Sequence, residues 1–261
     1  MKIIKADPAK NITVLVLDPV KDKGERAALV RAIMVDDRIG AEQVGFVIKP
    51  ASGSQTWRLE MADGEFCGNA TRCFGLYVAR EMGLKGRLKI PVSVSGIKES
   101  VLTEVDTELG WAAAEIPGPL SIDTLDYNGI SLPVLVFEGI THIIAQDLEP
   151  EKEHFFAIKA LLEAKFSGFV FPAFGVMFYD TGSNFMRPAV YVHSLVYESS
   201  CGSGSAALGA WLSQGLWDGS VKYTINQPGG AIEIDITRKA GKISFIAIGG
   251  KVELGKPEEF L

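Results

Sequence analysis

The feature that most constrains this chain is a short motif that occurs twice, half the chain apart. Cys-Gly-Asn stands at 67–69 and Cys-Gly-Ser at 201–203, so the two cysteines lie 134 positions apart (201 − 67) in a sequence of 261 residues. At the same offset Gly75 corresponds to Gly209. Each motif directly precedes a stretch with helical spacing of apolar residues, which predicts a cysteine at the start of each helix. A weak repeat of this length predicts two similar lobes.

Strand-like runs outnumber helical ones in the rest of the chain. They are short, rich in Val, Ile, Leu and Thr, and bounded by Gly, Pro, Asn or Asp. They span the N-terminal segment and 12–17, 44–48, 56–60, 88–94, 111–116, 132–136, 142–145, 176–179, 189–193, 221–225, 232–237 and 242–248. Because strands and helices do not alternate regularly, the pattern predicts an α+β fold. With the repeat, it predicts an N-terminal lobe at 1–120 and a C-terminal lobe at 121–261, joined by a short crossover at 116–126.

Four segments have helical character: 25–36, 69–82, 151–165 and 203–213. The apolar residues of 69–82 recur at spacings of three and four, which predicts one apolar face. The segment 203–213 is almost wholly apolar or small, so we expect a helix that is buried on most sides.

Charge and hydropathy exclude several classes of protein. A formal net charge of -6 and a pI near 5.2 give no electrostatic reason to expect nucleic acid or an anionic membrane as a partner. The sequence contains no run of about 18 apolar residues, and its N-terminus has no cleavage site made of small residues. We therefore expect a cytoplasmic protein that acts on a small molecule. The three histidines, His142, His154 and His193, show no metal-ligand spacing with the cysteines, so no metal site is predicted.

A cysteine at a helix start is suited to moving protons. The first N–H groups of a helix lack intrahelical partners and carry about half a positive charge, so anions bind there and a thiol pKa is lowered. The same N–H groups can stabilise the enediolate that forms when an amino acid loses its α-proton. Inversion of that carbon requires one acid–base group on each face. Cys67 and Cys201 are therefore predicted to be catalytic, whereas Cys73 is expected to be a small buried apolar residue.

These motifs resemble those of the diaminopimelate epimerase family, whose members work without pyridoxal phosphate. The likeness covers most of the chain and is carried by MADGEFCGNATRC at 61–73 and by the second cysteine motif. The resemblance implies two pseudo-symmetric lobes, each a mixed sheet wrapped around a central helix, with the site in the cleft between them. It also implies that the enzyme has no cofactor, and it makes a homodimer an expectation. The substrate contacts it implies are Asn11, Gln43, Gly68, Asn69, Gly202 and Ser203.

A closer likeness is to the histidine racemase branch of that family, which supplies D-histidine for opine metallophores of the staphylopine kind. NITVLV, EQVGF, EFCGNAT, YESSCGSG and QPGG resemble this branch. The Glu-Arg pair of diaminopimelate epimerase is missing before Cys201, and Ile140-Thr141-His142 replaces its Asn-Pro-His turn. Glu198 then becomes a candidate for binding the substrate ammonium group. The candidates for an imidazole pocket are Phe66, Phe185 and Tyr197.

Other functions stay open from the sequence alone. The same chemistry could act on diaminopimelate, proline or another amino acid. A non-catalytic binding protein or a thiol-redox protein on the same scaffold is a separate class, and the two intact cysteine motifs count against it. Isomerases of related fold that shift a double bond need only one base, so the second cysteine counts against them as well.

Overall fold

The computed structural model describes residues 1–50, 56–166, 173–192 and 194–260. The chain divides into two compact units. Unit 1 comprises Met1–Ile116 and Ala247–Leu261, and unit 2 comprises Pro117–Ile246. None of the helices in the described ranges is long and apolar enough to cross a membrane.

Unit 1 is a mixed sheet in the order β1–β2–β3–β4–β5–β6–β7–β16, with β17 and β18 also paired to β1. Neighbours are antiparallel except β2–β3 and β4–β5, which are parallel. The strands are β1 (Lys2–Asp7), β2 (Thr13–Val16), β3 (Gln43–Ile48), β4 (Arg58–Met61), β5 (Arg87–Val94), β6 (Val101–Asp106), β7 (Trp111–Glu115), β16 (Lys242–Lys251), β17 (Glu253–Leu254) and β18 (Glu258–Glu259). The first half of β16, up to Ile246, belongs to unit 2.

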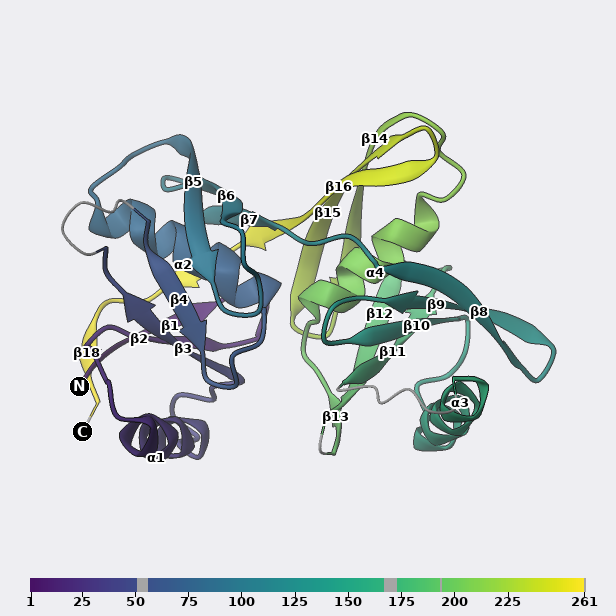
Figure 1. Cartoon of the computed structure of the whole chain (residues 1–261), viewed down its shortest axis with the longest axis horizontal. Coiled ribbons are helices and arrows are strands. Elements are labelled where there is room, and N and C mark those ends of the chain that lie inside the picture. Colours follow the sequence, from purple (N-terminus) through teal and green to yellow (C-terminus); the bar gives the residue numbers. More distant parts are fainter. Residues whose placement is uncertain (51–55, 167–172, 193, 261) are drawn as a thin grey trace. The chain divides into compact units, whose positions relative to one another are not determined.

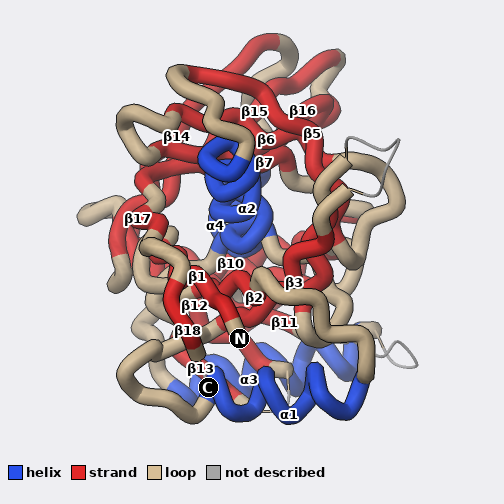
Figure 2. The backbone as a smooth tube through the Cα atoms, turned by 90° about the vertical axis from the view of Figure 1, so that its left-hand side faces the viewer, coloured by secondary structure: helices blue, strands red, loops and turns tan. Residues whose placement is uncertain are grey.

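Two helices cover the two faces of this sheet. On one face α1 (Lys23–Met34) begins where the Asp22 carboxylate accepts a hydrogen bond from the Glu25 N–H, and it buries Leu29 and Ile33. On the other face α2 (Gly68–Glu81) packs among β5, β6 and β7 (Figures 1 and 2). Twelve of its 14 residues are buried, so it is the centre of the core and not the one-sided helix that the apolar spacing predicts. Strands wrap it on several sides, which removes the exposed face.

Unit 2 is a second mixed sheet, in the order β8–β9–β10–β11–β12–β14–β15, with β13 antiparallel to β12. Its parallel pairs are β10–β11 and β12–β14. From β9 to β15 the pairs run antiparallel, parallel, antiparallel, parallel and antiparallel, as they do from β1 to β6. The strands are β8 (Ser121–Tyr127), β9 (Ile130–Val136), β10 (Thr141–Gln146), β11 (Phe174–Asp180), β12 (Phe185–Tyr191), β13 (Leu195–Tyr197), β14 (Gly219–Gln227) and β15 (Gly230–Lys239).

The helices of unit 2 stand at the same places in the chain as those of unit 1. A surface helix, α3 (Lys152–Lys165), follows β10, and Phe155 at its inner side stacks on Phe174 with ring centroids 4.9 Å apart. The central helix, α4 (Gly202–Leu212), lies against β15, β10 and β11 (Figure 1). Eight of its 11 residues are buried, which confirms the prediction from its apolar composition.

Two boundaries differ from the sequence prediction. The predicted crossover at 116–126 is too long, because β8 already begins at Ser121 and pairs with β9. The predicted C-terminal lobe, 121–261, differs from unit 2 at its end. Residues 247–251 of β16 pair with β7, and β17 and β18 pair with β1, so the C-terminal segment packs in unit 1. Part of the predicted strand 189–193 also lies outside the described residues, at position 193.

Candidate active site

Cys67 is the residue that caps the N-terminus of α2. Its backbone is extended, with φ -126° and ψ 111°, and the Ala70 N–H donates to its sulfur over 3.5 Å. Thr71 donates its hydroxyl to the Cys67 carbonyl at 2.7 Å. The thiol therefore takes the position that a Ser, Asp or Asn side chain takes at other helix starts. An N–H directed at the sulfur is a donor that favours a thiolate over a thiol.

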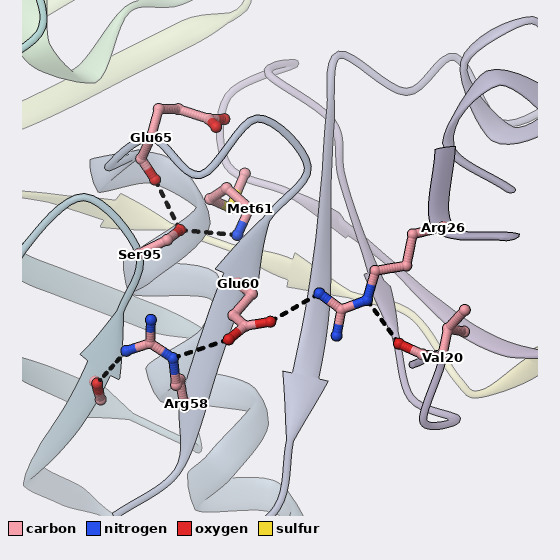
Figure 3. Close-up of polar contacts among 8 residues, drawn as sticks. Val20, Arg26, Arg58, Glu60, Met61, Glu65 and Ser95 are labelled. Carbon is pink, nitrogen blue, oxygen red and sulfur yellow. Dashed lines mark hydrogen bonds and ion pairs between the residues drawn. The ribbon is translucent and has the colours of Figure 1, made fainter. Parts of the chain in front are cut away.

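The segment that leads into Cys67 is held by the end of β5. The Ser95 hydroxyl accepts from the Met61 N–H at 2.9 Å and donates to the Glu65 carbonyl at 2.8 Å (Figure 3). Gly96 follows with φ +76°, and a Cβ at this position would lie 2.4 Å from the Phe66 nitrogen. A side chain is excluded there by both the backbone angle and the space. On the other face of the sheet the Glu60 carboxylate forms ion pairs with both Arg26 and Arg58 (Figure 3).

A buried polar chain extends from the first turn of α2 to the N-terminal strands. Arg72, fully buried, donates from Nε to Asn69 Oδ1 at 3.1 Å. Asn69 Nδ2 donates to Asn11 Oδ1 at 3.1 Å, and Asn11 Nδ2 donates to Glu42 Oε2 at 2.7 Å. The chain joins two predicted site residues, Asn11 and Asn69, in one contact. A third, Gln43, directly follows Glu42 and begins β3.

Cys201 caps α4 with almost the same backbone as Cys67, φ -124° and ψ 113°. Ser205 donates its hydroxyl to the Cys201 carbonyl at 2.6 Å, as Thr71 does to Cys67 in α2. Gln227 closes a ring around the cap, because its Oε1 accepts from the Cys201 N–H and its Nε2 donates to Ser205, both at 2.8 Å. Thr71 and Ser205 are again 134 positions apart (205 − 71), so the repeat extends to the hydroxyl that braces each cysteine.

The groups around the Cys201 thiol shift its pKa in opposite directions. Burial raises its pKa well above 9.0, and the Glu198 carboxylate, which accepts a hydrogen bond from the thiol, raises the pKa further. The Gly204 N–H and the Ser203 hydroxyl act in the other direction, and Ser203 Oγ is 3.7 Å from the sulfur. The expected lowering of the pKa at a helix start is therefore wrong for Cys201, because desolvation and a nearby negative charge outweigh the N–H donors. In this environment Cys201 is a thiol at neutral pH.

His142 stands behind Ser203. It is fully buried, and burial lowers its pKa to about 3, so its ring is neutral. Its Nε2 is 2.9 Å from Ser203 Oγ, whereas its buried Nδ1 has no hydrogen-bond partner among the described residues. A buried donor without a partner costs more than a buried acceptor, so the proton belongs on Nε2. His142 then donates to Ser203, and the serine's own hydrogen is free to point at the Cys201 sulfur.

Comparison with known proteins identifies the group to which this architecture belongs. A family model described as the N-terminal domain of the histidine racemase CntK matches residues 1–256. A histidine racemase of Fusobacterium nucleatum is 32% identical over 271 aligned positions, which cover 98% of this chain and 97% of that protein. This chain belongs to the histidine racemase family. It is accordingly an amino-acid racemase, an isomerase.

More distant relatives agree with the family. A histidine racemase of Staphylococcus aureus is 25% identical over 244 positions, covering 90% of this chain and 88% of that one. The crystal structure of a probable proline racemase from Agrobacterium radiobacter has the same fold, with a TM-score of 0.69 at 14% identity over 100% of this chain and 92% of that one. The mixed-sheet α+β fold predicted from the sequence is thus confirmed as the fold of this class of racemase and epimerase.

The two glycines that follow the cysteines of this racemase are both buried. At Gly68 a Cβ would lie 2.6 Å from Ile116 Cδ1 and 2.9 Å from Ile248 Cδ1. A side chain at position 68 would therefore require the ends of both isoleucines to move, so glycine lets the helix start pack closely against them.

Three residues important to the geometry of this racemase were missed by the sequence analysis: Glu42, Arg72 and Gln227. Arg72 stands inside the quoted MADGEFCGNATRC stretch and Gln227 inside QPGG, so motif membership was the available signal. Glu42 begins the EQVGF stretch and directly precedes the predicted Gln43, so the same signal was available for it.

The predicted aromatic pocket has no direct support in the racemase's contacts. Tyr197 donates its hydroxyl to the Pro150 carbonyl, and the Arg187 guanidinium lies 5.3 Å from the centre of the Phe185 ring. Their role, and that of Phe66, stays a prediction. Among the described residues no group of three His, Cys, Asp or Glu side chains is arranged to hold a metal ion; His193 lies outside that set.

Proposed function

We propose that this racemase inverts the α-carbon of histidine by a two-base mechanism, with Cys67 and Cys201 acting from opposite faces. The observation that carries the proposal is the matched pair of cysteine caps. Their backbone angles agree within 2°, and each has its carbonyl braced by a hydroxyl four residues later. The equal order of strand pairing in the two units supports treating them as pseudo-symmetric halves of one enzyme. The histidine specificity is carried over from the names of the relatives.

In the proposed step one cysteine takes a proton from the α-carbon and the other cysteine gives a proton to it. A thiolate on one face removes the α-hydrogen and becomes a thiol, and the electron pair of the broken C–H bond moves into the carboxylate to form an enediolate. The thiol on the opposite face then protonates the α-carbon and becomes the thiolate. The enzyme ends with the two protonation states exchanged, and the reverse reaction begins from that form.

The environment of Cys201 supports its starting the cycle as the protonated partner. Burial and Glu198 favour its thiol, and they outweigh the Gly204 N–H, which corresponds to the Ala70 N–H directed at Cys67. When the free enzyme converts between its two protonation forms, Glu198 is the group that can accept the Cys201 proton, and Cys67 takes up a proton from water in exchange. Glu198 is therefore proposed as an acid–base partner of Cys201, in addition to the predicted contact with the substrate ammonium group.

The substrate carboxylate is proposed to bind at the N-terminal turns of α2 and α4. The first N–H groups of a helix have no intrahelical partner, and two such ends offset the charge of an enediolate. Preorganised donors of this kind are worth about 2.7–4 kcal/mol each in acyl-transfer enzymes. The residues assigned to substrate binding remain Asn11, Gln43, Gly68, Asn69, Glu198, Gly202 and Ser203.

Because backbone dipoles and thiols supply all of these steps, we propose that the enzyme needs no cofactor. Activity should survive exhaustive dialysis and metal chelation, measured as the rate of racemisation before and after treatment. Restoration of a lost activity only by added pyridoxal phosphate or zinc would contradict the proposal.

Incubation in deuterated water with each L-amino acid tests substrate and chemistry together. We expect L-histidine to exchange its α-hydrogen for deuterium and to lose optical rotation, and diaminopimelate and proline to react far more slowly. Cys67→Ala and Cys201→Ala should abolish racemisation. Cys73→Ala is the matched control, since this thiol is buried in the core with its pKa raised to about 12, and it should keep the activity. Racemisation by either of the first two variants at the parental rate would refute the mechanism.

A further inference from the structure

Unit 1 contains a fully buried arginine that the proposed mechanism does not use. Besides its bond to Asn69, Arg72 donates from Nη2 to the Pro8 carbonyl at 3.1 Å and from Nη1 to the Lys251 carbonyl at 3.4 Å. One side chain just after the first turn of α2 therefore holds three segments that are far apart in the sequence. A buried charge is costly, so its retention next to a catalytic helix start requires an explanation.

The two ends of the polar chain give it a fixed direction. A guanidinium can only donate hydrogen bonds and a carboxylate can only accept them. Arg72 thus requires the oxygen of the Asn69 amide to face it, which directs the Asn69 nitrogen to Asn11. Glu42 requires the nitrogen of the Asn11 amide to face it, which directs the Asn11 oxygen to Asn69. A flip of the Asn69 amide would set two donors against each other at Arg72, and a flip of the Asn11 amide would set two acceptors against each other at Glu42.

We infer that Arg72 is a positioning residue for the Cys67 half of the active site. It fixes the orientation of the Asn69 and Asn11 amides and locks the first turn of α2 to the N-terminal strands. This keeps the Ala70 N–H on the Cys67 sulfur. Arg72 acts through the two amides, which it reaches by its Nε bond to Asn69. The inference concerns the reactivity of Cys67 and rests on the proposed function only where turnover is measured.

Unit 2 provides a matched control in Arg238. This guanidinium is also buried, and it donates to Ser213 Oγ at 3.1 Å, to the Ala210 carbonyl at 2.8 Å and to the Gly241 carbonyl at 2.7 Å. It stabilises the C-terminal end of α4, and among the described residues its hydrogen bonds do not lead to a cysteine cap. Arg72→Lys and Arg238→Lys therefore remove comparable sets of hydrogen bonds, but only the first disturbs a chain that ends at a catalytic helix start.

The test measures the rate at which iodoacetamide alkylates Cys67 between pH 6 and 9, with mass spectrometry to locate the label. In a Cys201→Ala background only Cys67 reacts, because Cys73 is fully buried with its pKa raised to about 12. We expect Arg72→Lys to slow alkylation at neutral pH about tenfold and to move the profile to higher pH, as about one unit of thiol pKa would do. Arg238→Lys should lower the melting temperature and leave the profile unchanged.

Glu42→Gln covers the case in which Arg72→Lys does not fold. A glutamine can donate or accept, so the Asn11 amide is no longer held in one orientation, and a smaller shift in the same direction is expected. In the otherwise intact enzyme a β-chloro amino acid adds a second readout. Arg72→Lys should slow chloride elimination from the enantiomer that Cys67 deprotonates, and Arg238→Lys should leave the ratio of the two enantiomers unchanged.

An unchanged alkylation profile in both Arg72→Lys and Glu42→Gln would overturn the inference, whatever the loss of stability. Equal profiles for the Arg72 and Arg238 variants would do the same. A shifted profile with equal slowing of both enantiomers would keep the role of Arg72 and contradict the two-base assignment, so the two failures are distinguishable.

Discussion

At the scale of single residues, the two cysteines share a backbone position but not an electrostatic environment. Each sulfur has an N–H directed at it, from Ala70 at Cys67 and from Gly204 at Cys201, but Cys201 is buried next to the Glu198 carboxylate, whereas Cys67 is partly exposed. Helix position alone predicts a lowered pKa for both thiols. This fails at Cys201, because the burial of the thiol and the hydrogen bond that it donates to Glu198 are established only when the chain folds. The sequence identified the two sulfurs but not their protonation states.

Removal of the Glu198 charge tests this environment directly. Glu198→Gln should lower the pKa of Cys201, because the neighbouring negative charge raises it, and should reduce kcat about 10²-fold, as loss of a general acid–base partner does. Thiolate absorbance against pH in a Cys67→Ala background measures the first effect, with Glu163→Gln on the exposed side of α3 as a control. A rise in the Cys201 pKa would contradict the assignment.

His142 makes stability depend on pH on the acid side. Its pKa falls from 6.5 in the unfolded chain to about 3 in the folded protein. Between these two pH values His142 is protonated in the unfolded chain but neutral in the folded protein. The stability from this group is complete above pH 6.5 and is lost as pH falls towards 3, by about 1.4 kcal/mol per unit. Urea unfolding of His142→Gln should lack this part of the acid dependence. An equal loss of stability on acidification in parent and variant would refute the effect.

At the scale of elements, α2 and α4 are packed so closely against strands that a side chain at either of two corresponding glycines would force a neighbour to shift. A Cβ on Gly75 would lie 2.3 Å from Thr103 Oγ1, and one on Gly209 would lie 2.7 Å from Ile234 Cγ2. The sequence predicted both helices to within one residue, because their apolar content is continuous. It missed β6 and β8, and the first four residues of β8 are exposed. The Asn128-Gly129 turn, with φ of 54° and 79°, was the local signal that could have revealed the β8–β9 hairpin.

These glycines should not tolerate alanine. Gly75→Ala and Gly209→Ala are expected to lower the free energy of unfolding by about 1–3 kcal/mol, the usual cost of overpacking a core. Gly215→Ala is the matched control, because a Cβ at this position would meet no neighbouring atom within 4 Å, and its change should stay within about 0.5 kcal/mol. Urea denaturation measures all three. An unchanged free energy of unfolding in Gly75→Ala and Gly209→Ala would contradict this prediction, because it would mean that the neighbouring strands move aside at little cost.

At the scale of the whole molecule, the chain forms two units whose boundary the repeat predicts only in part. The first boundary, after Ile116, lies close to the predicted position 120, since it falls between two strand-rich halves. The return of residues 247–261 to unit 1 could not be predicted, because a repeat in the sequence does not reveal which edge strand a C-terminal segment will pair with. The expected homodimer likewise stays a prediction, which the mass in solution would test.

A two-base site implies sensitivity to oxidation. If the two thiols address one α-carbon, mild oxidation should join them in a disulfide and abolish activity, reductant should restore it, and substrate should protect. Racemisation rates and peptide mapping under each condition measure this. Full activity in the oxidised enzyme would contradict the shared site.

Chloride elimination from the two enantiomers of a β-chloro amino acid tests the two-base claim most directly, because elimination needs proton removal but no reprotonation. Cys67→Ala and Cys201→Ala should each eliminate chloride from one enantiomer only, and the two variants should act on opposite enantiomers. If both variants processed the same enantiomer, the assignment of one cysteine to each face would be wrong.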